Sequence, residues 1–347
     1  MFTRCAMALP LRSTKATLPL MLAAALWLSG CERGPAPQPA SASATQAANG
    51  AEPPLLVLVS VAPQAYFAER VGGANVRVEC LVGPGQSPHT FEPTPRQAAQ
   101  LAQARVYFTV GIPFESVLLA KLPRGESGPE IVDTRAGIEL RRLTPAESAA
   151  DAHEHENAQG HDVPQRAESV SDESAGAVDP HIWLDPLRVK RQARTMCDAL
   201  ARLAPQHSAE FERNFAAFAA NLDHLHERLS KLLAPYRGRE FYVFHPAYGY
   251  FADAYGLKQA PIEIEGKEPG PRALAQLIER ARAAGTKVIF YQPQYSKAAA
   301  EAVARAIGAS VVPLDPQPRD WLAAMDELAA ALEQALAAAE AQRTEHP

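Results

Sequence analysis

The sequence predicts an α/β protein of two lobes, each a small, mostly parallel sheet wrapped by helices, with one long rigid helix joining the lobes. Three observations predict this class. Strand-like and helix-like segments alternate from residue 55 to residue 110, and the alternation restarts after residue 235. An apolar stripe at helical spacing lies between the two stretches. Strictly alternating elements favour parallel sheets covered by helices.

The N-terminal lobe is expected over residues 55–204. Its first strand, 55–61, is a continuous apolar run rich in β-branched residues, which is typical of a strand covered on both faces. Thr94 followed by Pro95 predicts a helix start, because threonine caps helices and proline fits their first position. The other elements expected in this lobe are strands at 76–82 and 106–110 and helices at 63–71 and 187–203.

A connecting helix is predicted over residues 205–235. Its apolar residues are spaced alternately four and three apart, which places them on one helix face. A helix of about 30 residues spans roughly 45 Å at about 1.5 Å per residue, enough to run along both lobes as a stiff spine. The stripe consists of Phe211, Phe215, Phe218, Leu222, Leu225, Leu229 and Leu232.

The C-terminal lobe is expected over residues 236–347, again as alternating strands and helices. The predicted strands are 241–244, 260–264, 287–291 and 310–314; the predicted helices are one ending at Tyr255, 272–284, 297–307 and a last helix at the end of the chain.

The N-terminus predicts a lipoprotein signal peptide over residues 1–31. A basic start precedes a short apolar stretch, and small residues then lead to Cys31. The stretch is too short to span a bilayer comfortably. The tetrapeptide 28–31 resembles a lipobox, in which Cys31 becomes the lipidated first residue. Residues 32–54 are rich in proline, serine and alanine and are expected to form a flexible tether that holds the folded part near a membrane.

Composition limits the partners and the redox chemistry. The net charge of −5 argues against a nucleic-acid partner. About 290 residues follow the tether, enough for two lobes with their own cores.

Only Cys80 and Cys197 lie outside the leader. An oxidising compartment permits a disulfide bond between them, but two buried thiols agree equally well with the sequence.

Four residues in turn-rich motifs are candidates for one metal site: His89, His181, His245 and Asp315. His245 and Asp315 fall at the ends of predicted strands, where open parallel sheets bind ligands. Two candidates come from each half, so the site is expected in the cleft between the lobes. Three imidazoles and one carboxylate suit a tetrahedral site for zinc or a related divalent ion. Imidazole favours zinc, and zinc ranks above manganese at nitrogen sites, so Zn²⁺ is expected rather than Mn²⁺.

The segment 151–178 is acidic and almost without apolar residues, so a mobile loop is expected. Its histidines, His153, His155 and His161, form a candidate weak metal-binding loop. A solvated insertion that binds no metal fits the sequence equally well.

Two other functional classes fit the metal residues. A zinc-dependent hydrolase would use the same ligands with an open position for water. However, the chain has no His-Glu-x-x-His pair and no feature that singles out a general base. The same four residues are also consistent with a manganese receptor or a metal-dependent adhesin of the same fold.

The motifs together resemble the zinc- and manganese-binding solute receptors of bacterial ABC importers, the family with a rigid helical backbone between two lobes. The resemblance covers nearly everything from residue 55 onward. It is carried by the motifs at 88–95, 179–186, 244–251, 265–269, 291–294 and 314–316.

The resemblance implies that His89, His181 and His245 bind the metal, with Asp315 as the fourth ligand. Together with the lipobox, this predicts a periplasmic or extracytoplasmic, membrane-anchored lipoprotein. The protein is expected to be a monomer and not an enzyme. Such a receptor captures zinc and docks on the membrane permease of a metal importer. A partner ATPase supplies the energy, since this chain has no Gly-x-x-x-x-Gly-Lys-Ser/Thr loop.

Overall fold

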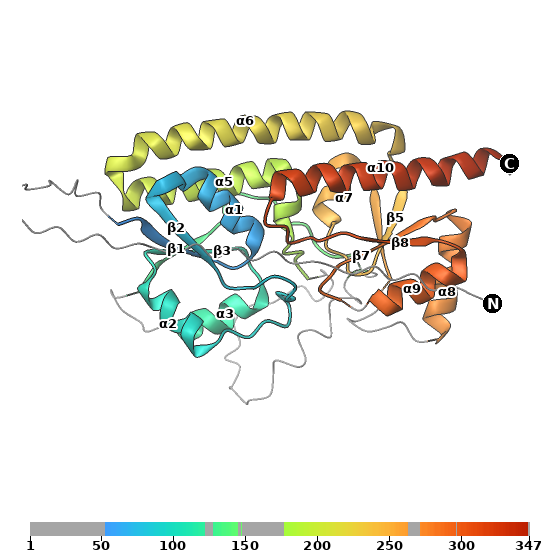
Figure 1. Cartoon of the computed structure of the whole chain (residues 1–347), viewed down its shortest axis with the longest axis horizontal. Helices are drawn as coiled ribbons and strands as arrows, with labels where there is room; N and C mark the ends of the chain where they lie inside the picture. Colours follow the sequence, from blue (N-terminus) through green and yellow to red (C-terminus); the bar gives the residue numbers. More distant parts are fainter. Residues whose placement is uncertain are drawn as a thin grey trace, which may run out of the picture. The chain divides into compact units, whose positions relative to one another are not determined.

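Two four-stranded parallel sheets form the centre of the fold, one in each half of the chain (Figure 1). This computed structural model describes residues 53–121, 128–144, 147, 177–262, 271–295 and 297–345. The strand orders are β2-β1-β3-β4 and β6-β5-β7-β8, so the second half repeats the topology of the first. The strands are β1 (Leu55–Val59), β2 (Val76–Cys80), β3 (Val106–Thr109), β4 (Glu130–Asp133), β5 (Glu240–Val243), β6 (Lys258–Pro261), β7 (Val288–Tyr291) and β8 (Ser310–Pro313).

Apart from α3, the helices lie where the alternation predicts them, and two have well-defined caps. Thr94 and Gln97 form a reciprocal capping box at the start of α2. Asp185 accepts a hydrogen bond from the backbone N–H of Leu187 and so caps α5. The helices on the two sheets are α1 (Ala62–Gly72), α2 (Pro95–Gln103), α3 (Pro113–Ala120), α5 (Pro186–Leu203), α7 (Gly249–Tyr255), α8 (Pro271–Ala283) and α9 (Lys297–Ile307).

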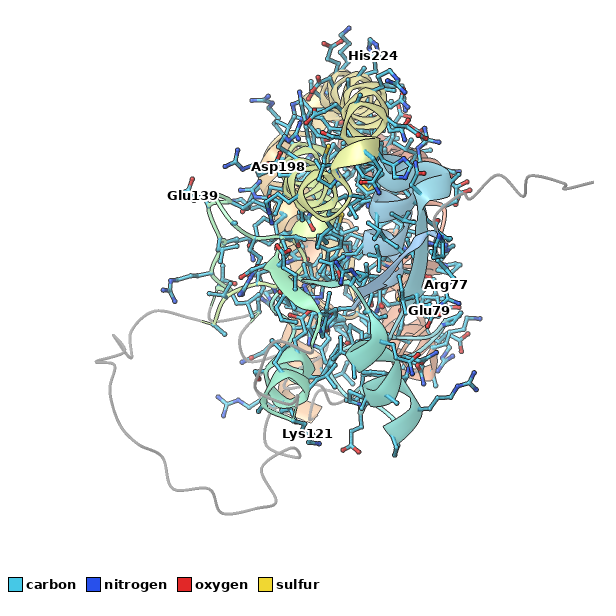
Figure 2. All side chains as sticks on the ribbon, turned by 90° about the vertical axis from the view of Figure 1, so that its left-hand side faces the viewer. Arg77, Glu79, Lys121, Glu139, Asp198 and His224 are labelled. Atoms are coloured by element: carbon cyan, nitrogen blue, oxygen red, sulfur yellow. The ribbon has the colours of Figure 1, made fainter. Side chains whose placement is uncertain are left out.

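The predicted connecting helix is α6 (Ser208–Leu233), whose 26 residues span about 39 Å at about 1.5 Å per residue. It packs along α1, α5 and α10 and reaches α7 (Figure 1). Five residues of the apolar stripe are buried as expected, whereas Phe215 and Leu232 are only partly buried; the neighbouring Leu233 is fully buried at the end of the helix. His224 projects from the outer side of α6 and is exposed (Figure 2).

A second long helix, α10 (Trp321–Glu345), also ties the halves together. The ring of Trp321 packs edge-on against Phe67 of α1, with 5.3 Å between the ring centroids. One hydrophobic cluster therefore extends from β1 through α5 and α6 to α10, while a smaller one lies under α8 and α9. Burial of this continuous cluster opposes any wide separation of the lobes. The prediction of two α/β lobes joined by a long helix is confirmed, with α10 as an added connection.

Three local features differ from the sequence expectation. Helix α3 and strand β4 were not expected, and β6 begins at Lys258, two residues before the predicted strand. Strand β4 lies at the edge of its sheet and is partly exposed, so it lacks the continuous apolar run of a central strand. Strand β6 is likewise an edge strand, and it begins with the polar residues Lys258 and Gln259.

Several sequence expectations fall outside the described residues. These are the signal peptide with Cys31, nearly all of the tether, and the loop histidines His153, His155 and His161. Among the described helices, none is long and apolar enough to cross a membrane.

Glu115, in the first turn of α3, joins the ends of two strands. Its carboxylate accepts hydrogen bonds from the backbone N–H groups of Val110, at 2.9 Å, and Gly111, at 2.7 Å, directly after β3. It also accepts one from the hydroxyl of Ser60, directly after β1. The side chain is only 3% exposed. These contacts place the start of α3 against the carboxyl edge of the first sheet.

Replacing Glu115 with glutamine is expected to change how stability depends on pH. Burial raises the pKa of the Glu115 carboxyl above its ordinary value of 4.5, although its hydrogen bonds work in the opposite direction. Between the two pKa values the folded chain keeps a proton that the unfolded chain has lost, so the contribution of Glu115 to stability falls as the pH rises. Each pKa unit by which the folded and unfolded states differ corresponds to about 1.4 kcal/mol in the free energy of unfolding.

Urea unfolding of both proteins from about pH 4 to about pH 8 measures this effect. The free energy of unfolding of the wild type, minus that of Glu115→Gln, should be largest at the acid end and decrease above about pH 4.5. A difference that does not vary with pH would contradict a raised pKa.

Candidate metal centre

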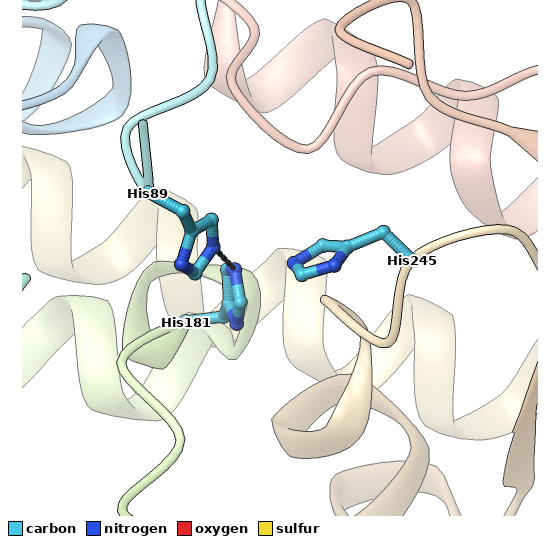
Figure 3. Close-up of side chains that lie close together, drawn as sticks. All are labelled: His89, His181 and His245. Carbon is cyan, nitrogen blue, oxygen red and sulfur yellow. Dashed lines mark hydrogen bonds between the residues drawn. The ribbon is translucent and has the colours of Figure 1, made fainter. Parts of the chain in front are cut away.

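Three of the four predicted metal residues meet in the structure. His89, His181 and His245 each offer a ring nitrogen, and these nitrogens lie within 4.8 Å of one another (Figure 3). All three side chains are buried, with exposed fractions of 9%, 3% and 2%. His89 comes from the loop between β2 and α2, His181 from the turn before α5, and His245 from the loop between β5 and α7. Both lobes therefore contribute to the cluster.

The spacing of the rings suits one tetrahedral ion. Two nitrogens that are each about 2.0–2.1 Å from a tetrahedral zinc lie about 3.3–3.4 Å apart. The Nε2 atoms of His89 and His181 are 3.3 Å apart. The ring centroid of His245 lies 4.8 Å from that of His89 and 5.3 Å from that of His181. A short movement of His245 would complete a set of three nitrogen ligands.

His181 is oriented by Asp179, a fully buried residue of its own motif. The Oδ1 atom of Asp179 accepts hydrogen bonds from Nδ1 of His181, at 2.8 Å, and from its backbone N–H, at 2.9 Å. A proton on Nδ1 leaves the lone pair on Nε2, the atom that faces His89. Carboxylates commonly fix the tautomer of metal-binding histidines in this way.

His245 is held through its backbone by Gln292, the residue after β7. The side-chain oxygen of Gln292 accepts from the N–H of His245 at 2.9 Å, and its amide nitrogen donates to the carbonyl of His245 at 2.8 Å. The ring of Tyr295 stacks on the imidazole, with 5.0 Å between centroids and an interplanar angle of 22°. Gln292 therefore fixes the loop and Tyr295 supports the ring.

The loop that carries His89 is anchored by an aromatic contact. Phe91, two residues further on, packs edge-on against Phe114 of α3, with 4.9 Å between the ring centroids. Helix α3, which was not expected from the sequence, thus supports this loop.

Asp315 is not part of the histidine cluster in this structure. Its Oδ1 atom accepts hydrogen bonds from the side-chain amide of Gln294, at 2.8 Å, and from the N–H of Gln317, at 2.9 Å. The side chain lines a pocket that also contains Gly83, on the loop leading to His89.

The Asp315 segment is nevertheless tied to two of the three histidine motifs. Tyr248 donates its hydroxyl proton to the carbonyl of Leu314 at 2.8 Å, and Nε1 of Trp183 donates to the carbonyl of Pro316 at 2.7 Å. Two aromatic residues, one near His245 and one near His181, thus hold the backbone on either side of Asp315.

The two described cysteines are free thiols and form no disulfide bond. Burial raises the pKa of Cys80 to about 12 and that of Cys197 to about 11. Both thiols are therefore protonated at neutral pH, a state that does not bind zinc.

Comparison with known proteins decides the family. Residues 57–335 match the family described as zinc-uptake complex component A, periplasmic (ZnuA). This chain belongs to that family. The high-affinity zinc uptake system protein ZnuA of Yersinia pestis is 28% identical over 265 residues, which cover 75% of this chain and 82% of that protein.

Two solved structures of ZnuA resemble the chain closely. A crystal structure of ZnuA is 37% identical, with a TM-score of 0.69, and the match covers 82% of this chain and 99% of that one. A ZnuA deletion mutant with zinc bound is also 37% identical, with a TM-score of 0.68, over 81% of this chain and 98% of that one.

Membership of the ZnuA family confirms the expected functional class. The chain is a periplasmic or otherwise extracytoplasmic solute-binding protein of a zinc-uptake ABC system, with a site of three histidines, and it is not an enzyme. The hydrolase interpretation is therefore wrong. Sequence reasoning named the histidines but assigned no role to Asp179 or Gln292. The Asp-x-His spacing at 179–181 was a local signal that could have identified Asp179. Gln292 had no such signal, because it contacts His245, 47 positions away in the sequence.

Proposed function

We propose that this chain captures one zinc ion between its lobes through His89, His181 and His245 and delivers it to a membrane permease. The observation that carries the proposal is the buried cluster of three imidazoles contributed by both lobes. Neutral imidazole is a preferred zinc ligand, and the fully buried Asp179 supplies a negative charge beside the cluster. Zinc is the cargo, so it must be bound tightly and yet released.

Asp315 is the proposed fourth ligand. Its carboxylate would exchange the hydrogen bond from Gln294 for the ion, while Tyr248 and Trp183 keep the flanking backbone in place. A carboxylate together with three imidazoles would fill all four positions of a tetrahedral zinc. A catalytic zinc needs an open position for water or substrate, so the filled site fits a carrier better than an enzyme.

Delivery requires partners outside this chain. The proposed partners are the permease and ATPase subunits of the importer, and the permease would receive the ion. Since one hydrophobic cluster runs through β1, α6 and α10, wide opening of the lobes would expose a large apolar area. Release is therefore expected through a small displacement of the ligand loops, such as the loop of His245.

Calorimetric titration of zinc into chelator-treated protein tests the proposal. The expected result is one tight site per chain. Protein that binds no zinc tightly, or that binds two equivalent ions, would contradict a single inter-lobe site.

Deleting residues 151–176 is expected to leave the affinity of the tight zinc site unchanged within about threefold. The three clustered histidines lie outside this segment, and the deletion spares Ala177, whose carbonyl accepts from the N–H of Leu143. Any weak binding by His153, His155 and His161 should disappear. The same titration on both proteins measures the two effects. A large loss at the tight site would mean that the segment contributes to it directly.

Cys31 is the proposed lipid anchor, on the evidence of residues 28–31. Cys31→Ser is expected to abolish labelling with palmitate and to release the protein from the membrane fraction. Cys80→Ser, expressed in the same cells, is the matched control and should still label and sediment. Normal labelling of Cys31→Ser would contradict the lipobox interpretation.

A further inference from the structure

A partly buried arginine, Arg141, binds the carboxylate that orients His181. Its Nη1 atom is 3.3 Å from Oδ2 of Asp179, while the other oxygen of that carboxylate holds His181. Its Nη2 atom donates to Glu147 at 2.9 Å, and its Nε atom donates to Asp253 at 2.9 Å. The Arg141 side chain is only 13% exposed. One guanidinium thus joins three carboxylates, a geometry that lysine cannot reproduce.

These contacts cross between the lobes. Arg141, Glu147 and Asp179 belong to the first half of the chain, whereas Asp253 lies on α7, the helix that follows the His245 loop. Tyr250, also on α7, accepts from the backbone N–H of Arg141 at 2.8 Å and donates to the carbonyl of Asp179 at 3.0 Å. Side chain and backbone therefore both connect the His181 motif to α7.

Arg141 packs closely against Gly249, at the start of α7. A Cβ atom on Gly249 would lie 2.6 Å from Cζ of Arg141 and 2.7 Å from Oδ2 of Asp179. Real Cβ atoms essentially never approach that closely. The pair of Arg141 and Asp179 therefore packs directly against the backbone of α7, four residues after His245.

We propose that Arg141 is a positioning residue for zinc binding: through Asp179 it aims His181 at the ion, and through α7 it sets the distance between His181 and His245. This inference rests on the proposed function, in which His181 binds zinc. Removing the guanidinium would free one oxygen of Asp179 and loosen the link to α7. The histidines would then have to be ordered by the ion itself, at a cost to affinity.

The test is a double-mutant cycle on the full chain, with Arg141→Gln, Asp179→Asn and the double variant. Zinc affinity is measured by competition with a chelating dye, and the visible absorption of bound cobalt(II) reports ligand geometry. Arg141→Gln is expected to weaken zinc binding about tenfold, at the low end of the effect of removing a partner of a metal ligand, and to alter the cobalt spectrum. In the Asp179→Asn background the same substitution should weaken zinc binding by clearly less than tenfold, because the route through Asp179 is already lost and only the link to α7 remains.

Arg188→Gln is the matched control. Arg188 pairs with Asp185 and lies over the ring of Tyr250, 4.7 Å from its centroid. Among the described residues, the ion pairs of Asp179 are with Arg141 and His181 instead. Its replacement should leave zinc affinity and the cobalt spectrum unchanged. Gly249→Ala is a second variant that displaces Arg141 without removing a charge, and it should weaken zinc binding in the same direction.

Three results would overturn the inference. They are wild-type affinity in Arg141→Gln, an equal loss in Arg188→Gln, and a loss that persists undiminished in the Asp179→Asn background. A loss of that last kind would show a merely structural role. His181→Ala, measured in parallel, separates this inference from the proposed function. If that variant binds zinc as tightly as the wild type, the assignment of His181 as a ligand is itself wrong.

Discussion

His181→Ala is expected to weaken zinc binding by at least about 100-fold, because the loss of a ligand should cost no less than the loss of a partner that orients one. The substitution removes one of three clustered nitrogens and leaves the buried carboxylate of Asp179 without its imidazole. Competition with a chelating dye measures the affinity. Thermal unfolding of the zinc-free protein shows whether the fold survives.

His224→Ala is the matched control for this experiment. His224 lies on the exposed side of α6, outside the cluster (Figure 2). Its replacement should leave zinc affinity unchanged, since neither a ligand nor a packed side chain is lost. Equal affinities for the two variants would remove His181 from the site.

Asp179→Asn should have the second-largest effect, a loss of about 10-fold to 100-fold in zinc affinity. The amide has nearly the same shape as the carboxylate, so packing is preserved while the negative charge is lost. It also offers an N–H group in place of one acceptor, which weakens the preference for a proton on Nδ1 of His181.

The corresponding control is Asp198→Asn. Asp198 is an exposed aspartate that pairs with Arg194 on the surface of α5. Zinc affinity should be unaffected by that change. If Asp179→Asn also bound zinc like the wild type, the hydrogen bond to His181 would have no role in binding.

Elements with a strong local signal could be predicted from the sequence. Helix α9 has the predicted bounds, 297–307, and α2 begins after the Thr94 cap. The apolar stripe predicted α6, because a periodic apolar face needs no knowledge of what covers it. Helix α3 and strand β4 could not be predicted in this way. Glu115 holds α3 through groups that follow β1 and β3, and β4 is an edge strand completed by pairing with β3.

The same distinction between local and long-range signals applies to the candidate site. His89, His181 and His245 could be named from the sequence because each lies in a turn near a predicted element, and turns at strand ends are where α/β folds bind ligands. The residues that orient these histidines could not be named from the sequence, because their roles depend on contacts between residues far apart in the chain. Arg141 meets Asp253 across 112 positions, and Gln292 meets His245 across 47. Asp315 remains a prediction, since the structure places its carboxylate on Gln294.

A crystal structure of the zinc-loaded protein, with anomalous scattering recorded at the zinc absorption edge, tests the central claim most directly. The expected result is one anomalous peak between the lobes, with a nitrogen of each of the three histidines about 2.0–2.1 Å from it. An oxygen of Asp315 should complete the tetrahedron at about 2.0–2.2 Å. Water in that position would leave a three-histidine site without Asp315. A peak elsewhere, or one bound by fewer than two of these histidines, would contradict the proposed site.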